Sequence, residues 1–195
     1  MTGGTSDARD RLIEGTRQLL WDRGYVGTSP TAIWKAAGVG QGSMYHHFDG
    51  KPDLVLAAEE RAASEMQDQV RRILSGEGPA YDRIAAYLLK ERDALRGCPI
   101  GRLAADPEIA GDATLREPVR ETFVVLHECL VAAIEEGKAG GEFRDDLDAA
   151  GISYALSAVI QGGYTLARAE GSVVPFDRAV QGALELLRLA THEGR

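Results

Sequence analysis

The 195-residue sequence has little cysteine, few aromatic residues (6%) and no run of eighteen or more uncharged apolar residues. The missing apolar run predicts that no segment spans a membrane. The first residues, MTGGTSDARDR, contain no apolar core, so we expect no export signal and predict a cytoplasmic location. The two cysteines, Cys98 and Cys129, form no Cys-x-x-Cys pair. We interpret them as reduced core thiols, with a thiol redox sensor as the alternative.

The sequence also lacks the motifs of the common enzyme classes. It contains no paired carboxylates at a defined spacing, no nucleophile elbow, no phosphate-binding loop and no zinc motif. His127 and Cys129 stand two residues apart in a predicted helix, so their side chains point to opposite sides and His127 cannot activate the thiol. The neighbours His46 and His47 point about 100° apart on a helix and have no partner cluster, so no metal site is expected. We therefore predict a protein that is not an enzyme and has no cofactor.

Positive charge is scarce. The net charge is −8, and residues 1–60 contain six Lys and Arg against eight Asp and Glu, a net charge of −2. Such a chain repels non-specific DNA. If it binds DNA, it depends on neutral donors, helix N-termini and few cationic contacts, and its affinity depends only weakly on salt.

The most informative stretch is residues 28–54, which read TSPTAIWKAAGVGQGSMYHHFDGKPDL. Pro30 suits the first turn of a helix, and Thr28 or Ser29 can serve as its N-cap. Gly38 stands where a helix ends in the left-handed conformation. A second short helix is predicted from Gln41 to about His47. Two short helices joined by a glycine-containing turn indicate a helix-turn-helix.

The apolar residues of this stretch fall on one side. We expect a small shared core formed by Ile33, Val39, Met44 and Phe48, with Met44 and Phe48 spaced i,i+4. A first helix over residues 7–23, capped by Ser6 or Asp7, packs beneath it through a stripe of apolar residues and one threonine. The stripe consists of Leu12, Ile13, Thr16, Leu19 and Leu20.

The run from Ala36 to Phe48, AAGVGQGSMYHHF, followed by Lys51-Pro52-Asp53-Leu54, resembles the DNA-binding module of the TetR/AcrR family of bacterial transcriptional regulators. The strong resemblance covers about residues 7–60. The chain departs from the usual pattern at Pro30, Trp34 and Gly40. Gly40 replaces a serine cap, and the bulky ring of Trp34 stands where a small residue is usual. We therefore expect Trp34 at the DNA backbone or against the second domain.

The chemistry of the second short helix suits base recognition. Gln41 can pair with an adenine edge, Ser43 can donate to or accept from a base, and Gly42 allows close approach of the backbone. The resemblance implies that six residues contact phosphates: Thr28, Ser29, Thr31, Tyr45, His47 and Lys51. His46 is also included among the predicted DNA-binding residues. The alternative is that these are only solvated polar residues.

The rest of the chain has a helical period and no strand pattern. Helices are predicted over 51–74, 80–96, 114–136, 145–169 and 175–192, with a short segment from Cys98 to about Ala105 and loops at Asp106-Pro107 and Gly111-Asp112. The predicted fold is all-α with about nine helices. We place a three-helix DNA-binding head with a helix-turn-helix in residues 1–50, and a larger ligand-binding and dimerisation domain in residues 51–195.

Small residues are concentrated in the last two predicted helices, where they allow close helix approach. They are Ala149, Gly151, Ser153, Ala155, Ser157, Ala158, Gly162 and Gly163, facing Ala179, Gly182, Ala183, Leu186 and Leu187. One interpretation is packing within the chain. The other, implied by the resemblance, is a two-fold homodimer with a four-helix bundle.

By resemblance, the second domain binds a small molecule that releases DNA. Candidate pocket residues combine aromatic faces with a few polar groups: Tyr87, Phe123, His127, Tyr154, Gln161 and Tyr164. Few cations stand among them, which favours a neutral or cationic apolar inducer. We predict a ligand-responsive regulator, a repressor of a palindromic operator. The alternative is a helical small-molecule-binding or interaction protein that no longer binds DNA.

Overall fold

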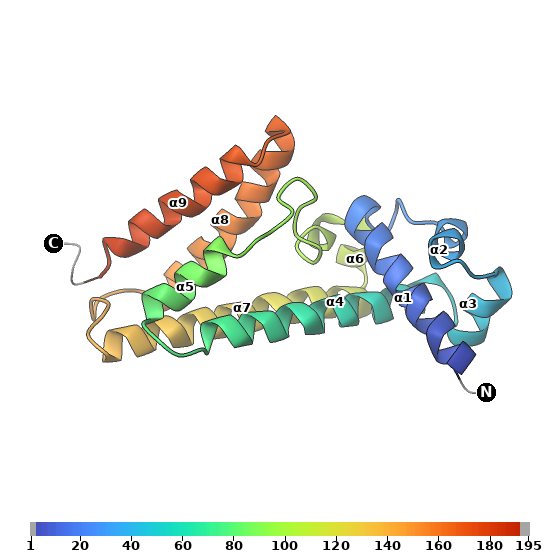
Figure 1. The fold of residues 1–195 in the computed structure, drawn as a ribbon, viewed down its shortest axis with the longest axis horizontal. Coiled ribbons are helices and arrows are strands. Elements are labelled where there is room, and N and C mark those ends of the chain that lie inside the picture. The colour runs from blue at the N-terminus through green and yellow to red at the C-terminus, as the bar shows by residue number, and fades with distance from the viewer. Residues whose placement is uncertain (1–2, 192–195) are drawn as a thin grey trace. The chain divides into compact units, whose positions relative to one another are not determined.

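The computed structural model describes residues 3–191, and in this part of the chain the regular structure is helical (Figure 1). The predicted all-α fold class is confirmed. In chain order the elements are α1 (Gly3–Arg23), α2 (Pro30–Ala37), α3 (Gln41–His47), α4 (Lys51–Leu74), α5 (Ala80–Leu89), the 3₁₀ helix η1 (Leu103–Ala105), α6 (Pro107–Gly111), α7 (Ala113–Ala139), α8 (Ala149–Glu170) and α9 (Val174–Arg188).

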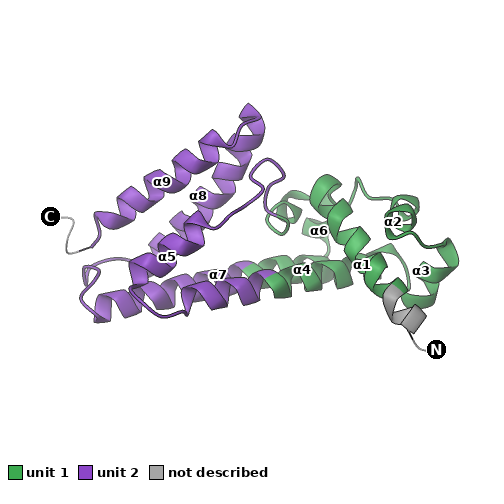
Figure 2. Ribbon diagram, viewed as in Figure 1, with its two compact units in different colours: residues 1–65, 99–122 green, residues 66–98, 123–195 purple. Residues whose placement is uncertain are grey.

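The chain packs into two compact units, each formed by two stretches of sequence (Figure 2). Unit 1 comprises residues 1–65 and 99–122, and unit 2 comprises residues 66–98 and 123–195. The helix α4 therefore begins in one unit and ends in the other. The division of function at residue 50 stays a prediction, because compact packing does not test which residues bind which partner.

Unit 1 is built on the apolar stripe of α1. Leu12 and Thr16 are fully buried, and the other residues of the predicted stripe are buried with them. Gly15, next to Thr16, has no side chain, and this lets the backbone of Ala36 and Ala37 approach α1 closely. The stripe thus fixes α2 against α1, as the sequence predicted.

The helices α2 and α3 begin and end where their cap residues predict. The Ser29 side chain accepts a hydrogen bond from the Ala32 amide (3.2 Å), and Pro30 follows in the first turn. Gly38 ends α2 with φ 63°, a left-handed conformation that favours glycine. Met44 and Ile33 are fully buried between the helices. The helix-turn-helix is therefore a small, closed packing unit.

Several helix boundaries differ from the prediction, and two of them lie in α1 and α5. The helix α1 begins at Gly3, so Ser6 and Asp7 lie inside it rather than capping it. The helix α5 ends at Leu89, seven residues before the predicted end. The cause is Arg92, whose guanidinium donates to the carbonyls of Tyr87 (2.6 Å) and Leu88 (2.8 Å) and so satisfies the free end of the helix.

Between α5 and α7 the sequence predicted a loop at Asp106-Pro107. The structure instead contains the short helices η1 and α6 on either side of Asp106. Asp106 accepts a hydrogen bond from the Glu108 amide (3.1 Å), and Pro107 occupies the first helical position. The same Asp106 carboxylate accepts from the Tyr25 amide (2.8 Å) in the turn after α1. One side chain thus caps α6 and ties this segment to α1 within unit 1.

Unit 2 contains the antiparallel pair α8 and α9, with α5 beside α9. The Asp148 side chain accepts from the Gly151 amide (3.0 Å), which starts α8 at Ala149 rather than at residue 145. Gly163 lies against the Phe176 ring of α9, only 2.9 Å from where a side chain would begin. The helix α9 ends at Arg188, and residue 192, the predicted end, lies outside the described residues.

Two further findings concern the predictions about membrane spans and about the two cysteines. No helix within residues 3–191 is both long and apolar enough to cross a membrane. Cys98 is buried and Cys129 is half-buried, both as free thiols. Burial raises the pKa of the Cys129 thiol above its ordinary value, which favours the unreactive protonated form.

Candidate nucleic-acid interface

The helix α3 presents one polar surface to solvent. Gln41, Gly42, Tyr45 and His46 are exposed, and Ser43 and His47 are half-buried. The Tyr45 side chain has 54% of its surface accessible. A side chain added at Gly42 would meet no atom within 4 Å, so the backbone there is open to a close approach. The structure therefore brings the base-recognition candidates together on one face.

The start of α2 contributes a second polar group to this unit. Ser29 and Thr31 are exposed. Thr28 differs, because it is fully buried and its hydroxyl donates to the Gly24 carbonyl (2.7 Å). Its observed role is to hold the turn between α1 and α2. The geometry gives no support to the predicted phosphate contact of Thr28.

Lys51 also has a structural role that its sequence position did not indicate. Its ammonium donates to the Tyr25 carbonyl (2.8 Å) and lies 3.7 Å from the centre of the Tyr25 ring. Burial lowers the pKa of the Lys51 ammonium below its ordinary value. The phosphate contact implied by resemblance is a prediction that this geometry does not favour.

Replacing Lys51 by methionine is expected to lower the free energy of unfolding of unit 1 by about 1–2 kcal/mol, because a hydrogen bond and a cation–π contact are lost. Tryptophan fluorescence during urea unfolding measures this change, since both tryptophans, Trp21 and Trp34, lie in unit 1. The exposed Lys35→Met variant is the matched control. Unchanged stability together with weaker DNA binding would restore the phosphate role of Lys51.

Trp34 makes a contact that the sequence did not predict, and its expected place at the DNA backbone or against the second domain stays a prediction. Its indole N–H donates to the Met44 sulfur (3.0 Å), and the ring is half-buried. This contact lies within the helix-turn-helix and links α2 to α3. The bulky ring therefore strengthens the small core that holds the recognition surface.

Comparison with known proteins decides the family. Residues 12–58 match the family profile "Bacterial regulatory proteins, tetR family", and residues 80–183 match the profile "Tetracyclin repressor-like, C-terminal domain". The chain belongs to the TetR family. It is a helix-turn-helix transcriptional regulator of this family, and the predicted resemblance is confirmed.

Individual relatives agree over most of the chain. The HTH-type transcriptional regulator LmrA of Bacillus subtilis is 30% identical over 174 residues, covering 82% of this chain and 86% of LmrA. A TetR transcriptional regulator from Chloroflexus aurantiacus, 28% identical, superposes with a TM-score of 0.84 over 96% of this chain and 97% of its own. The regulator CifR, solved with a 26-bp double-strand operator DNA, shares the fold: 22% identity, TM-score 0.75, 90% and 94% coverage.

In the second unit of this TetR-family chain, two of the predicted ligand residues stack on each other. The rings of His127 and Tyr154 lie 4.0 Å apart between centres, and His127 Nδ1 is 2.8 Å from the Ser153 hydroxyl. Burial lowers the pKa of the His127 imidazole, which favours its neutral form. Phe123 and Gln161 are half-buried. This group offers an aromatic face beside a neutral polar pair.

Tyr87 and Tyr164 belong to a second cluster. Tyr164 stacks on Phe176 (4.8 Å between ring centres), and the Arg92 guanidinium lies 5.2 Å from the Tyr87 ring centre. Burial raises the pKa of both tyrosine hydroxyls, so they stay neutral donors. The sequence did not indicate Arg92, because its contacts depend on a helix end that periodicity placed elsewhere.

A groove of about 430 Å³ adjoins this cluster within unit 2. Its lining residues include Arg92, Lys90, Phe176 and Asp177. None of the six predicted ligand residues lines it. The assignment of those six residues to a ligand pocket stays a prediction.

Proposed function

We propose that this TetR-family regulator is a homodimeric repressor that binds a palindromic operator and is released by a small apolar inducer. The observation that carries the proposal is the exposed polar face of α3, held by a closed helix-turn-helix core. The profile matches at residues 12–58 and 80–183 support it, and so does the operator complex of CifR, which shares the fold. A cytoplasmic location belongs to the same proposal.

The low positive charge of the head shapes the binding mode. With a net charge of −2 over residues 1–60, phosphate neutralisation cannot supply most of the affinity. Gln41 and Ser43 can read base edges through neutral hydrogen bonds, and the exposed Ser29 and Thr31 hydroxyls can donate to phosphates. We therefore expect sequence-specific binding with a weak dependence on salt.

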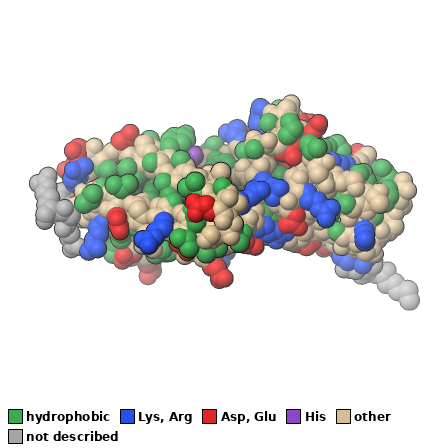
Figure 3. Space-filling view, turned by 90° about the horizontal axis from the view of Figure 1, so that it is seen from above, with side chains coloured by type: hydrophobic (Ala, Val, Ile, Leu, Met, Phe, Trp, Pro, Cys, Tyr) green, Lys and Arg blue, Asp and Glu red, His purple; other side chains and the backbone are tan. Residues whose placement is uncertain are grey.

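The exposed side of α8 supports the homodimer. Ser153, Ser157 and Gly163 are buried within the chain, so part of the small-residue surface packs internally. The opposite side of α8 is exposed and uncharged, and it consists of Gly151, Tyr154, Ala155, Ala158, Gly162, Thr165, Leu166 and Ala169. On α9, Leu186 is 71% exposed. Figure 3 shows hydrophobic side chains at the surface of this unit. A two-fold partner would cover these residues and place two heads about 34–36 Å apart for successive major grooves.

Gly162→Arg is expected to convert the dimer into a monomer. An added side chain at Gly162 meets no atom within 4 Å of its own chain, so the fold of one chain accommodates it. In the proposed dimer the same side chain enters a close helix crossing. Size-exclusion chromatography with light scattering measures the mass. Gly111→Arg, also an exposed helical glycine with open space, is the control, and a dimeric Gly162→Arg protein would place the interface elsewhere.

The ligand assignment rests on unit 2. The His127–Tyr154 stack and the Tyr87–Tyr164 cluster provide aromatic surface with neutral polar groups, which suits an apolar compound that carries few hydrogen-bonding atoms. Such a compound releases DNA if it binds more tightly to the conformation that does not fit the operator.

The deciding experiment is a fluorescence-anisotropy titration of the purified protein with DNA from its own upstream region, followed by footprinting. A protected palindrome supports the repressor, and apolar compounds added to the complex then identify the inducer. A folded protein that protects no upstream DNA at low salt would favour the second candidate, a helical small-molecule-binding protein. The acidic head is the observation in favour of that candidate.

A further inference from the structure

Unit 1 contains a buried carboxylate that the DNA-binding function does not use. Glu59 of α4 is only 1% exposed. Neither of its two carboxylate oxygens has a hydrogen-bond partner among the described residues. A buried ionised carboxylate without a partner is strongly unfavourable, so the site calls for either a proton or a positively charged group.

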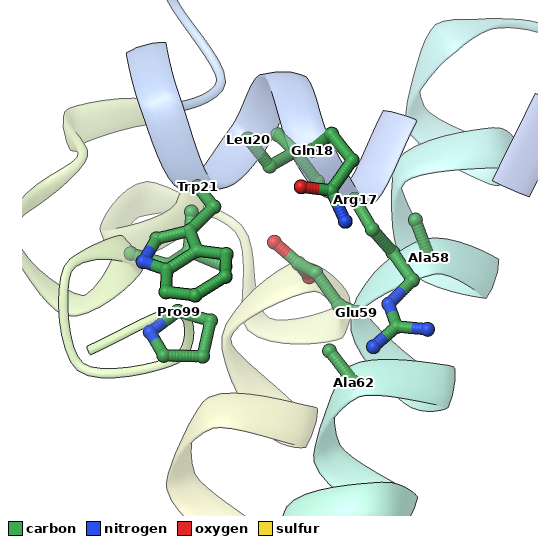
Figure 4. A pocket seen from close by; sticks show the side chains of 9 residues that line it. Arg17, Gln18, Leu20, Trp21, Ala58, Glu59, Ala62 and Pro99 are labelled. Carbon is green, nitrogen blue, oxygen red and sulfur yellow. The ribbon is translucent and has the colours of Figure 1, made fainter. Parts of the chain in front are cut away.

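The carboxylate points into a cavity of about 80 Å³ that lies wholly within unit 1 (Figure 4). Trp21 and Gln18 of α1 lie opposite it, and Pro99 packs against the Trp21 ring on one side. The remaining lining is mainly apolar and includes Leu20, Ala58, Ala62 and Leu103. The cavity thus combines the Glu59 carboxylate and the Trp21 ring with the polar side chains of Arg17 and Gln18 and an otherwise apolar lining.

The charges around Glu59 favour a cation. Arg17 of α1 also lines the cavity, but its guanidinium pairs with Glu14 (2.9 Å) and Glu65 (3.0 Å). From the segment after residue 99, Arg102 donates to the Trp21 carbonyl, and Asp106 and Asp112 add negative charge. Burial, followed by these two carboxylates, raises the pKa of Glu59 to about 8. A positive group in the cavity would offset both the burial of the Glu59 charge and its repulsion by Asp106 and Asp112.

The surroundings select an organic cation over a metal ion. No group of three or more histidine, cysteine, aspartate or glutamate side chains among the described residues could hold a metal. The Trp21 indole instead offers the aromatic face to which alkylammonium groups are attracted. A cavity of roughly 150 Å³ accommodates benzene, so about half that volume accommodates about three or four non-hydrogen atoms.

We propose that this cavity is a binding site for the ammonium group of a small organic cation, with Glu59 as its carboxylate partner and Trp21 as its aromatic wall. The site lies in the unit that carries the helix-turn-helix, and it is separate from the inducer residues proposed in unit 2. The cation pairs with the ionised carboxylate, so binding at pH 7 displaces the proton from those Glu59 carboxyl groups that carry one.

Propylammonium chloride is the probe. The full-length protein carries ¹³C-labelled glutamate, and NMR follows the Glu59 carboxyl carbon at pH 7 in a buffer free of amines. We expect the carboxyl signal to move from the protonated to the ionised position, with a Kd of the order of 1 mM for so small a ligand. A pH-stat measures the released proton. Propanol, a neutral molecule of the same shape, is expected to leave the signal in place, as is sodium chloride at equal concentration.

Two variants locate the site. Glu59→Gln is expected to weaken propylammonium binding at least tenfold, measured by calorimetry, and Trp21→Leu to weaken it severalfold. Glu60→Gln, which changes the exposed neighbouring carboxylate, is the matched control and should bind as the unchanged protein does. The proposal is wrong if Glu59 stays protonated under saturating propylammonium, or if the Glu59 and Glu60 variants bind equally. Neither outcome depends on whether the protein binds an operator.

Discussion

The Gln41→Ala, Tyr45→Ala double variant is expected to bind its operator at least about 100-fold more weakly than the unchanged protein. A bidentate contact between a glutamine and a base is worth about 1–3 kcal/mol, and loss of the Tyr45 contact adds to that. Because the head carries a net charge of −2, non-specific attraction to phosphates cannot compensate. The loss should therefore exceed that seen for a basic DNA-binding domain with the same two changes.

Both side chains are exposed, so the variant should fold normally. Fluorescence anisotropy with the footprinted operator measures affinity, and thermal unfolding checks the fold. Gln181→Ala, which removes an exposed glutamine from α9, is the control and should keep full affinity. Undiminished binding by the double variant would mean that α3 is not the recognition helix, even though the fold is that of the TetR family.

The helix-turn-helix could be predicted residue by residue because its boundaries are set by local chemistry. Ser29, Pro30 and Gly38 each act within a few residues of their own position, through a cap, a fixed φ and a left-handed turn. Such signals do not depend on distant parts of the chain. The predicted bounds of α2, α3 and α4 therefore agree with the structure.

Two of the wrong predictions depend on a side chain that lies just outside the helix concerned. The end of α5 depends on Arg92, which lies beyond the helix and turns back to its last carbonyls. The short helix α6 depends on Asp106, which also binds the turn after α1, some eighty residues earlier. Periodicity over a window cannot detect contacts of either kind.

Part of the candidate site could be predicted from local sequence signals. The α3 residues Gln41 and Tyr45 are exposed because Met44 beside them is buried, and this alternation is visible in the sequence. Lys51 and Thr28 have side chains that can reach either solvent or a nearby carbonyl, and only the fold decides between the two. Glu59 and Glu60 are neighbours, yet Glu59 is buried and Glu60 is exposed. The helical period places Glu59 on the apolar stripe, four residues after Val55, but the period does not reveal that its carboxylate lacks a partner.

That difference between Glu59 and Glu60 has a large expected effect on stability. The pKa of Glu59 is raised to about 8 in the folded chain, against 4.5 in the unfolded chain. Between these two values the folded state holds a proton that the unfolded state releases, so the free energy of unfolding falls as pH rises from about 4.5 to about 8. Each unit of pKa difference corresponds to about 1.4 kcal/mol. We expect Glu59 to reduce the stability of unit 1 by about 4 kcal/mol across this range.

Glu59→Gln should remove most of this dependence, because the amide is neutral at every pH. At pH 9 the variant is then expected to be more stable than the unchanged protein, whereas at pH 5 the two should differ little. Urea unfolding followed by tryptophan fluorescence at pH 5, 7 and 9, in buffers without amines, measures the slope in unit 1. Glu60→Gln should leave the slope unchanged, since an exposed carboxylate keeps nearly the same pKa on unfolding. If the Glu59 variant keeps the slope of the unchanged protein, its carboxyl group is already ionised at neutral pH, and a positive group or water that neutralises its burial must then be present in the cavity.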